Sequence, residues 1–342
     1  MVSILDEKAP PSPRSRIDHA LVGLIKDPRD LPFARLIFSA LLVLVPFATV
    51  VFVLDPLPWW LGAAYLAVLF PVFIDRYTLM LHNTSHRRLF GKGHEGLNIL
   101  VPLVLGPFMG QTPYTYFAHH IGMHHPENNL PDDLSSTMRF RRDSLRGFLV
   151  YYGTFMGLGI VQLVAYHRRR GHSRMARMAL FGELGWYLAI ALLLWLRPWP
   201  TLVVFVIPFL LIRFMMMAGN WAQHAFIDAA DPANPYRNSI TSINTRYNRR
   251  CFNDGYHIGH HVKANRHWSE MPSDFEAQLA TYRDQGAVVF QGLDYFQIWA
   301  LLMAKRYKSL ARHFVDLSER PRTEAEVIDF LRERTRPIPA SR

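Results

Sequence analysis

The sequence predicts an all-α integral membrane protein with four transmembrane helices, arranged as two hairpins, and a cytosolic helical cap. Half of the 342 residues are hydrophobic, they are concentrated in long runs, and basic residues gather outside those runs. A helix of about 20 apolar residues crosses the roughly 30 Å hydrocarbon core of a bilayer. We therefore interpret residues 1–342 as one membrane domain.

Two pairs of apolar runs are each joined by a short turn. Residues 34–54 and 59–81 flank Asp55-Pro-Leu-Pro58, and residues 179–196 and 199–219 flank a turn at Arg197-Pro198. Tryptophans stand beside both turns, as expected of an aromatic belt at a membrane interface. The two pairs are therefore predicted to be transmembrane hairpins.

Two further apolar segments, 98–117 and 147–166, do not fit this scheme. The first contains three prolines, and the second is rich in glycine and bracketed by arginines. Irregular backbone is tolerated at membrane depth only where protein shields it. We expect both segments to be re-entrant or interfacial; the alternative is that 147–166 forms a fifth span, paired with a sixth elsewhere.

Residues 220–342 are expected to be cytosolic and helical. Residues 294–307 are amphipathic, and Thr323-Glu-Ala-Glu326 has the capping-box pattern that opens a helix over 327–334.

Basic residues predict the orientation in the membrane. Residues 166–178 contain five arginines, whereas the two hairpin turns contain only Arg197. By the positive-inside rule, both termini and the cap face the cytoplasm, and a bacterial cytoplasmic membrane is the expected location. The net charge of +11 then reflects this bias and attraction to anionic lipid, not nucleic-acid binding. Four arginines could instead clamp a phosphate or carboxylate: Arg139, Arg141, Arg142 and Arg146.

Nine of the sixteen histidines occur in four short clusters beside the apolar runs. The clusters are His82-Asn-Thr-Ser-His86, His120-Ile-Gly-Met-His124-His125, Asn220-Trp-Ala-Gln-His224 and His257-Ile-Gly-His260-His261. Residues at i and i+4 share one helix face, so His82/His86, His120/His124 and Asn220/His224 should each point at one site. Nine nitrogen ligands are too many for one ion and suit two. His119 could replace His120, but the spacing to His124 favours His120.

The residue types around the histidines limit which metal the site could bind. A zinc protease would need a glutamate after His82, where Asn83 stands. The single cysteine, Cys251, excludes an internal disulfide and a thiolate-rich site. Copper and nickel accept imidazole, but a nitrogen-rich site with open positions suits iron and dioxygen. A ligating imidazole usually donates its other N–H to a carboxylate or carbonyl. The candidate carboxylates are Asp75, Asp132, Asp133, Asp228 and Asp254.

The ordered clusters resemble the histidine boxes of the integral-membrane fatty acid desaturase and hydroxylase superfamily, which includes the acyl desaturases and the alkane monooxygenases. The resemblance runs from about His82 to His261 and implies that the box histidines hold two irons at the cytosolic face. The implied ligands are His82, His86, His120, His124, His125, His224, His257, His260 and His261, with Asn220 approaching the second iron through water. The second box has three residues between its first two histidines, where many acyl-CoA desaturases have two. This difference counts against acyl-CoA as the substrate.

The resemblance implies an O2-dependent oxidoreductase acting on a long-chain fatty acyl substrate within membrane lipid. Desaturation of an acyl lipid is the leading expectation; hydroxylation, or oxidative decarboxylation of a free fatty acid to a terminal alkene, is the alternative. The chain has no haem or flavin motif, so an external donor, ferredoxin-like or similar, and its reductase are expected to supply electrons. A metal carrier would need polar residues along the spans, which contain little besides Glu183 and Arg213.

Overall fold

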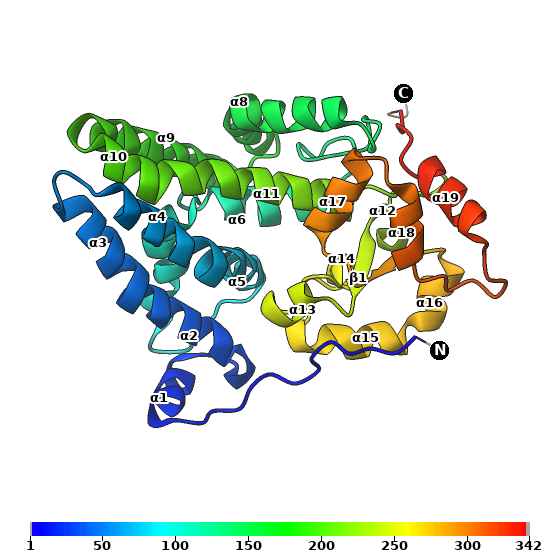
Figure 1. Ribbon diagram of the computed structural model, residues 1–342, viewed down its shortest axis with the longest axis horizontal. Helices are drawn as coiled ribbons and strands as arrows, with labels where there is room; N and C mark the ends of the chain where they lie inside the picture. Colours follow the sequence, from blue (N-terminus) through cyan, green and yellow to red (C-terminus); the bar gives the residue numbers. More distant parts are fainter. Residues whose placement is uncertain (1, 340–342) are drawn as a thin grey trace. The chain divides into compact units, whose positions relative to one another are not determined.

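The computed structural model describes residues 2–339, whose regular structure is helical apart from one pair of short strands (Figure 1). The chain forms two compact units. We call residues 10–121 and 163–214 the apolar unit, and residues 2–9, 122–162 and 215–339 the C-terminal unit.

Five helices are long and apolar enough to cross a membrane, which indicates an integral membrane protein. They are Pro28–Val53, Trp59–His86, Leu145–Arg169, Ser173–Leu196 and Pro198–Gln223. Their parts are η1 (Pro28–Asp30), α2 (Leu31–Ser39), η2 (Ala40–Leu44) and α3 (Val45–Val53); α4 (Trp59–Val68), η3 (Leu69–Ile74) and α5 (Asp75–His86); α8 (Leu145–Arg169); α9 (Ser173–Leu196); and α10 (Pro198–Thr201), η8 (Leu202–Val206) and α11 (Ile207–Gln223). Three of the four predicted runs lie within these helices, and the first, 34–54, ends one residue beyond Val53.

Residues 147–166, which were expected to be re-entrant or interfacial, lie within α8, one continuous helix of 25 residues that is long and apolar enough to cross a membrane. The candidate spans therefore number five, where the sequence predicted four. Its glycines do not break it, because Gly153 and Gly157 have helical backbone and lie on an open face. Apolar side chains such as Leu149 and Val161 are more than half exposed, as on a helix that faces lipid.

Prolines explain most of the irregular turns in the apolar helices. Proline has no N–H to donate, and its ring clashes with the carbonyl four residues earlier, so the preceding turn widens. That carbonyl falls inside a π-helical turn in four cases: η2 before Pro46, η5 (Val101–Leu105) before Pro107, η7 (His120–His124) before Pro126, and η8 before Pro208.

The segment 98–117 is broken, as its prolines predicted. It consists of η4 (Glu95–Leu100), η5, η6 (Pro107–Met109) and, after a turn, α6 (Thr115–His119). The turn requires glycine at position 110, where φ is +72° and a Cβ would stand 2.5 Å from the carbonyl oxygen of Pro208. Protein from α11 therefore packs directly against this irregular backbone.

The C-terminal unit surrounds a two-stranded parallel sheet that the sequence did not suggest (Figure 1). Strand β1 (Ile240–Ile243) pairs with β2 (Val288–Gln291), and both are buried. The helices of this unit are α7 (His125–Glu127), α12 (Pro235–Asn238), α13 (Arg246–Arg250), α14 (His257–Val262), η9 (Trp268–Glu270), α15 (Met271–Ala277), α16 (Leu279–Asp284), α17 (Tyr295–Met303), α18 (Tyr307–His313) and α19 (Glu324–Glu333). The capping box predicted at Thr323 and Glu326 does open α19.

The N-terminal residues pack within the C-terminal unit, while α1 (Arg16–Leu24) belongs to the apolar unit. Asp6 is 5% exposed, and its Oδ2 accepts hydrogen bonds from the Tyr256 hydroxyl at 2.7 Å, the Asn244 N–H at 2.7 Å and the Asn248 side chain at 2.9 Å. Because Tyr256 precedes His257, the contact reaches the start of α14.

Candidate metal centre

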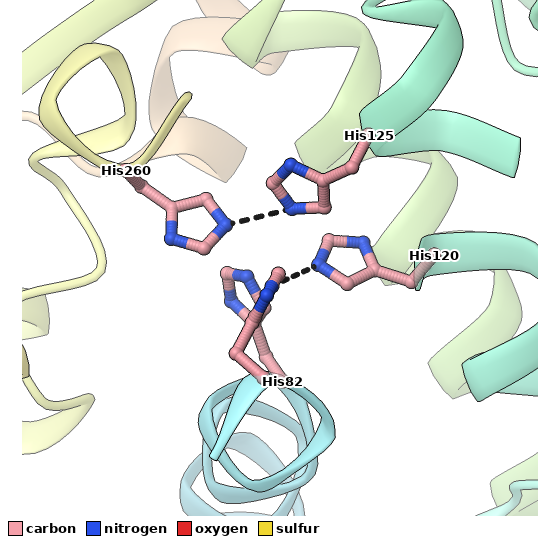
Figure 2. A group of neighbouring side chains, drawn as sticks. His82, His120, His125 and His260 are labelled. Carbon is pink, nitrogen blue, oxygen red and sulfur yellow. Dashed lines mark hydrogen bonds between the residues drawn. The ribbon is translucent and has the colours of Figure 1, made fainter. Parts of the chain in front are cut away.

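In the apolar unit, three predicted ligands form a histidine trio: His82, His86 and His120. His82 and His86 lie one turn apart on α5, with ring centroids separated by 5.5 Å. His120 begins η7, and its Nε2 lies 3.0 Å from Nε2 of His86 (Figure 2). One ring nitrogen from each of the three lies within 4.8 Å of the others. Tyr116, one turn earlier on α6, stacks on the His120 ring and orients it.

In the C-terminal unit, four predicted ligands form a histidine quartet: His124, His224, His257 and His261. One nitrogen from each lies within 4.8 Å of the other three. The His257 Nε2 lies 3.3 Å from that of His224 and 3.0 Å from that of His261. His124 ends η7, His224 follows α11, and the other two lie one turn apart on α14. Three distant segments thus converge on one point.

His120 and His124 do not share one site, contrary to the prediction from their spacing. His120 belongs to the trio, and His124 belongs to the quartet. The reason is the π-helical turn that the two residues bound, in which i and i+4 no longer lie one above the other. Pro126 requires this turn, because its ring would otherwise clash with the carbonyl of Gly122.

His125 and His260 form a further pair in the C-terminal unit, with their Nε2 atoms 3.0 Å apart (Figure 2). His125 directly follows His124 of the quartet, and His260 directly precedes His261. The Nε2 atoms of His125 and His260 lie against each other, and neither residue belongs to the quartet. The His-His doublets of the second and third boxes therefore each divide between the pair and the quartet.

Outer hydrogen bonds orient two quartet histidines. His124 Nδ1 lies 2.7 Å from Oδ2 of Asp133, and Asp133 also accepts from the backbone N–H of Asn129 and from Ser135. His224 Nδ1 donates to the carbonyl oxygen of Asn238 at 3.0 Å. In both rings Nε2 is then the atom left for a metal. The sequence anticipated Asp133; Asn238 lies 14 residues from His224, and no local pattern indicated it.

Two of the other proposed carboxylates have different partners. Asp228 pairs with Arg334 at 2.8 Å, and Asp254 accepts from the Tyr247 hydroxyl at 2.7 Å. These contacts stabilise the packing of the C-terminal unit.

Burial favours the neutral form of two quartet imidazoles. Burial, together with repulsion from the neighbouring His124, lowers the pKa of His224 to about 4. Burial also holds the pKa of His261 well below its ordinary value, with added repulsion from His257. Neutral rings present lone pairs, so these histidines are ready to bind a cation without first releasing protons.

Asn220 reaches the quartet region from α11, one turn before His224. Its Nδ2 donates to the Tyr151 hydroxyl at 2.7 Å and to the carbonyl oxygen of Ser135 at 3.0 Å. These two bonds occupy the amide nitrogen, so Oδ1 is the only atom of this side chain that could serve a metal or its water.

Three of the four arginines expected as a possible anion clamp make contacts within the protein. Arg142 is fully buried and donates to the carbonyl oxygens of Ala225 at 2.9 Å and Met138 at 3.0 Å. Arg141 pairs with Asp143 at 2.9 Å, and the Arg139 guanidinium lies over the Phe140 ring. Arg142 instead ties residue 225, directly after His224, to the preceding loop.

The residues present fit a metal of the kind the sequence predicts. Imidazole nitrogens bind first-row metals at about 2.0–2.1 Å, so opposite ligands stand roughly 4 Å apart, close to the spread of the quartet nitrogens. Converging neutral nitrogens can share few protons among themselves, and a cation satisfies all of them together. The donor set contains no thiolate and suits iron among other imidazole-binding metals.

Comparison with known proteins identifies a family. No curated protein matches this chain. No solved structure matches it either. The family model described as fatty acid desaturase matches residues 57–292, which is more than half of the chain and includes all nine clustered histidines. The chain therefore belongs to the fatty acid desaturase family.

Proposed function

We propose that this protein is an O2-dependent, non-haem di-iron fatty acid desaturase that introduces a double bond into the acyl chain of a membrane lipid. Family membership supports the fatty acyl substrate and the oxidoreductase class. The observation that carries the metal assignment is the quartet of imidazoles, three of them buried, with nitrogens within 4.8 Å of one another. We propose that the nine clustered histidines and Asn220 serve two irons, one of them held by the quartet.

When bound, the two irons supply the reduction of O2 and the removal of hydrogen from an unactivated methylene, which no side-chain acid or base can perform. In the overall reaction, a –CH2–CH2– unit, O2, two electrons and two protons are converted to –CH=CH– and two water molecules. The chain's own residues position the ligands: Asp133 and the Asn238 carbonyl hold the Nδ1 side of two rings, so their Nε2 atoms face inward. Arg142 pins the backbone next to His224.

Hydroxylation, or oxidative decarboxylation of a free fatty acid to a terminal alkene, is the second candidate. It uses the same histidines and differs in which carbon lies beside the metals and in the step after the first hydrogen removal. The three-residue spacing in His120-Ile-Gly-Met-His124 favours a branch other than the acyl-CoA desaturases.

We further propose that a ferredoxin-like or similar donor, with its reductase, delivers the electrons at the cytoplasmic side. The basic residues outside the spans support this, because a basic surface suits an acidic donor. The same charges support a bacterial cytoplasmic membrane, with both termini and the histidines in the cytosol. Turnover that is insensitive to salt when the donor is limiting would count against the electrostatic part of this proposal.

The test is expression in a bacterial host fed with fatty acids, with gas chromatography–mass spectrometry of total lipids and headspace hydrocarbons. His257→Ala serves as the inactive variant, and His313→Ala, which changes a half-buried histidine outside all four clusters, as its matched control. A new internal double bond in the wild type and His313→Ala, but not in His257→Ala, is expected. A volatile terminal alkene or a hydroxy acid would support the second candidate function instead of desaturation. The absence of any oxidised product would contradict both candidates.

A further inference from the structure

A groove of about 500 Å³ opens on the apolar unit, and no residue of the histidine trio lines it. Its walls come from η5, from the turn at Pro113 and Tyr114, and from α9. This volume lies within the range of sites that hold small organic ligands. None of the predicted metal ligands lines it.

One face of α9 gives the groove a charged end and an apolar length. Arg174 and Arg177 lie in the first turns of this candidate span, and Phe181, Gly185 and Trp186 follow at helical spacing. The arginines therefore stand at the end of a membrane-spanning helix, where lipid headgroups lie, and the apolar side chains continue toward the hydrocarbon. This arrangement matches an amphiphile with an anionic head.

The two arginines are available to such a head. Both side chains are exposed, and within residues 2–339 neither forms an ion pair with a carboxylate. Guanidinium groups three residues apart on a helix are neighbours and suit the oxygens of a phosphate, which they can bind through paired N–H donors.

The wall opposite α9 is preformed. Glu183 on α9 accepts hydrogen bonds from the hydroxyls of Thr112 at 2.5 Å and Thr115 at 3.1 Å, on either side of the turn. Arg213 neutralises Glu183 at 2.8 Å. Gly182 allows the turn to approach, because a Cβ there would overlap the carbonyl oxygen of Pro113. The groove therefore does not need a ligand to form.

We propose that this groove binds an anionic phospholipid of the surrounding bilayer, with its phosphate at Arg174 and Arg177 and one acyl chain along α9. The groove is open at its side: Phe181 is 65% exposed and Leu103 is 43% exposed. A chain lying there is covered on one side only. This suits one chain of a two-chain lipid whose other chain stays in the bilayer. The proposal does not depend on the reaction that the histidines support.

The test is native mass spectrometry of the full chain, purified in detergent and titrated with phosphatidylglycerol, phosphatidylcholine or oleate. Two variants act on the groove: Arg174→Gln with Arg177→Gln removes the charge, and Gly185→Leu fills the apolar part. A Cβ at Gly185 would meet nothing within 4 Å, so the larger side chain occupies the groove without straining the fold. Matched controls are Arg168→Gln with Arg169→Gln, and Gly153→Leu on the open face of α8.

We expect the double arginine variant to weaken phosphatidylglycerol binding roughly tenfold or more, since each basic residue near a lipid surface adds about a factor of five. Gly185→Leu should also weaken this binding, because its side chain occupies the place of the acyl chain. The two control variants should bind like the wild type, and phosphatidylcholine should bind more weakly than phosphatidylglycerol. Unchanged binding in both groove variants, or oleate binding as tightly as phosphatidylglycerol, would overturn the proposal.

Discussion

The trio and the quartet contain the same side chain but are built differently. His82 and His86 of the trio lie one turn apart on a single helix, so their proximity follows directly from the spacing in the sequence. The quartet joins three segments, and outer contacts from Asp133 and Asn238 orient two of its rings. The quartet therefore depends on the folded C-terminal unit, whereas the trio depends mainly on α5.

Removing one ligand from each group has the largest expected effect. His261→Ala and His86→Ala should each reduce turnover more than 100-fold, beyond the 10–100-fold cost of losing an outer partner. Both variants should still insert into the membrane, because His86 is the last residue of its helix, His261 lies outside the five apolar helices, and neither change makes an apolar run less apolar. Turnover and iron per chain are the measurements, with His313→Ala as the control. Full activity in His261→Ala would show that the quartet is not part of the metal centre.

Acid should weaken the quartet in the metal-free protein. The pKa of His224 is about 4 when folded, against an ordinary value of 6.5, so between these values the unfolded chain binds more protons. Stability is then fully present above pH 6.5 and falls by about 3 kcal/mol as the pH drops to about 4. Denaturant unfolding from pH 7 to 4 measures this. His224→Leu should flatten the dependence, and an equally steep curve in that variant would contradict the assignment.

Loss of the Asp133 carboxylate should affect the quartet and not the trio, because Asp133 contacts the quartet residue His124. Asp133→Asn keeps the shape but removes the charge that orients His124, and 10–100-fold weaker iron binding at the quartet is expected. Chelator competition with iron analysis measures the affinity. Asp228→Asn is the matched control, since this carboxylate pairs with Arg334 instead of a ligand. Equal losses in the two variants would mean that Asp133 acts only on folding.

The smallest expected effect concerns the N-terminal contact. Asp6→Asn weakens the charged hydrogen bond to Tyr256, beside the quartet residue His257, and should cost about 1–2 kcal/mol of unfolding free energy. Thermal unfolding measures it. Lys8→Ala removes a more exposed ion pair with Glu276 in the same segment and should cost less than 1 kcal/mol. If Lys8→Ala is as damaging as Asp6→Asn, the buried contact has no special role.

The sequence predicted the features that depend on local spacing and composition. The apolar runs, the broken segment 98–117 and the one-turn pair on α5 all follow from hydropathy, proline content and the 3.6-residue period. The helical period failed at His120 and His124, because Pro126 acts on the turn before it. The glycine-rich segment 147–166 is one continuous helix, and two of its glycines, Gly153 and Gly157, lie on an open face.

Long-range contacts could not be predicted from the sequence. The pairing of β1 with β2 joins residues almost 50 positions apart, and the Asn238 carbonyl reaches His224 only after α12 folds back. Asp6 meets Tyr256 across 250 positions. Such contacts are selected by packing of the whole unit and leave no periodic signal.

Metal analysis of the purified protein tests the central claim most directly. Inductively coupled plasma mass spectrometry on protein purified from iron-supplemented cells, with Mössbauer spectroscopy of ⁵⁷Fe-labelled material, reports both the amount and the coupling of the iron. We expect two irons per chain, falling in His261→Ala but not in His313→Ala. Zinc in place of iron, or a wild-type iron content that His261→Ala leaves unchanged, would contradict a di-iron centre built on the quartet.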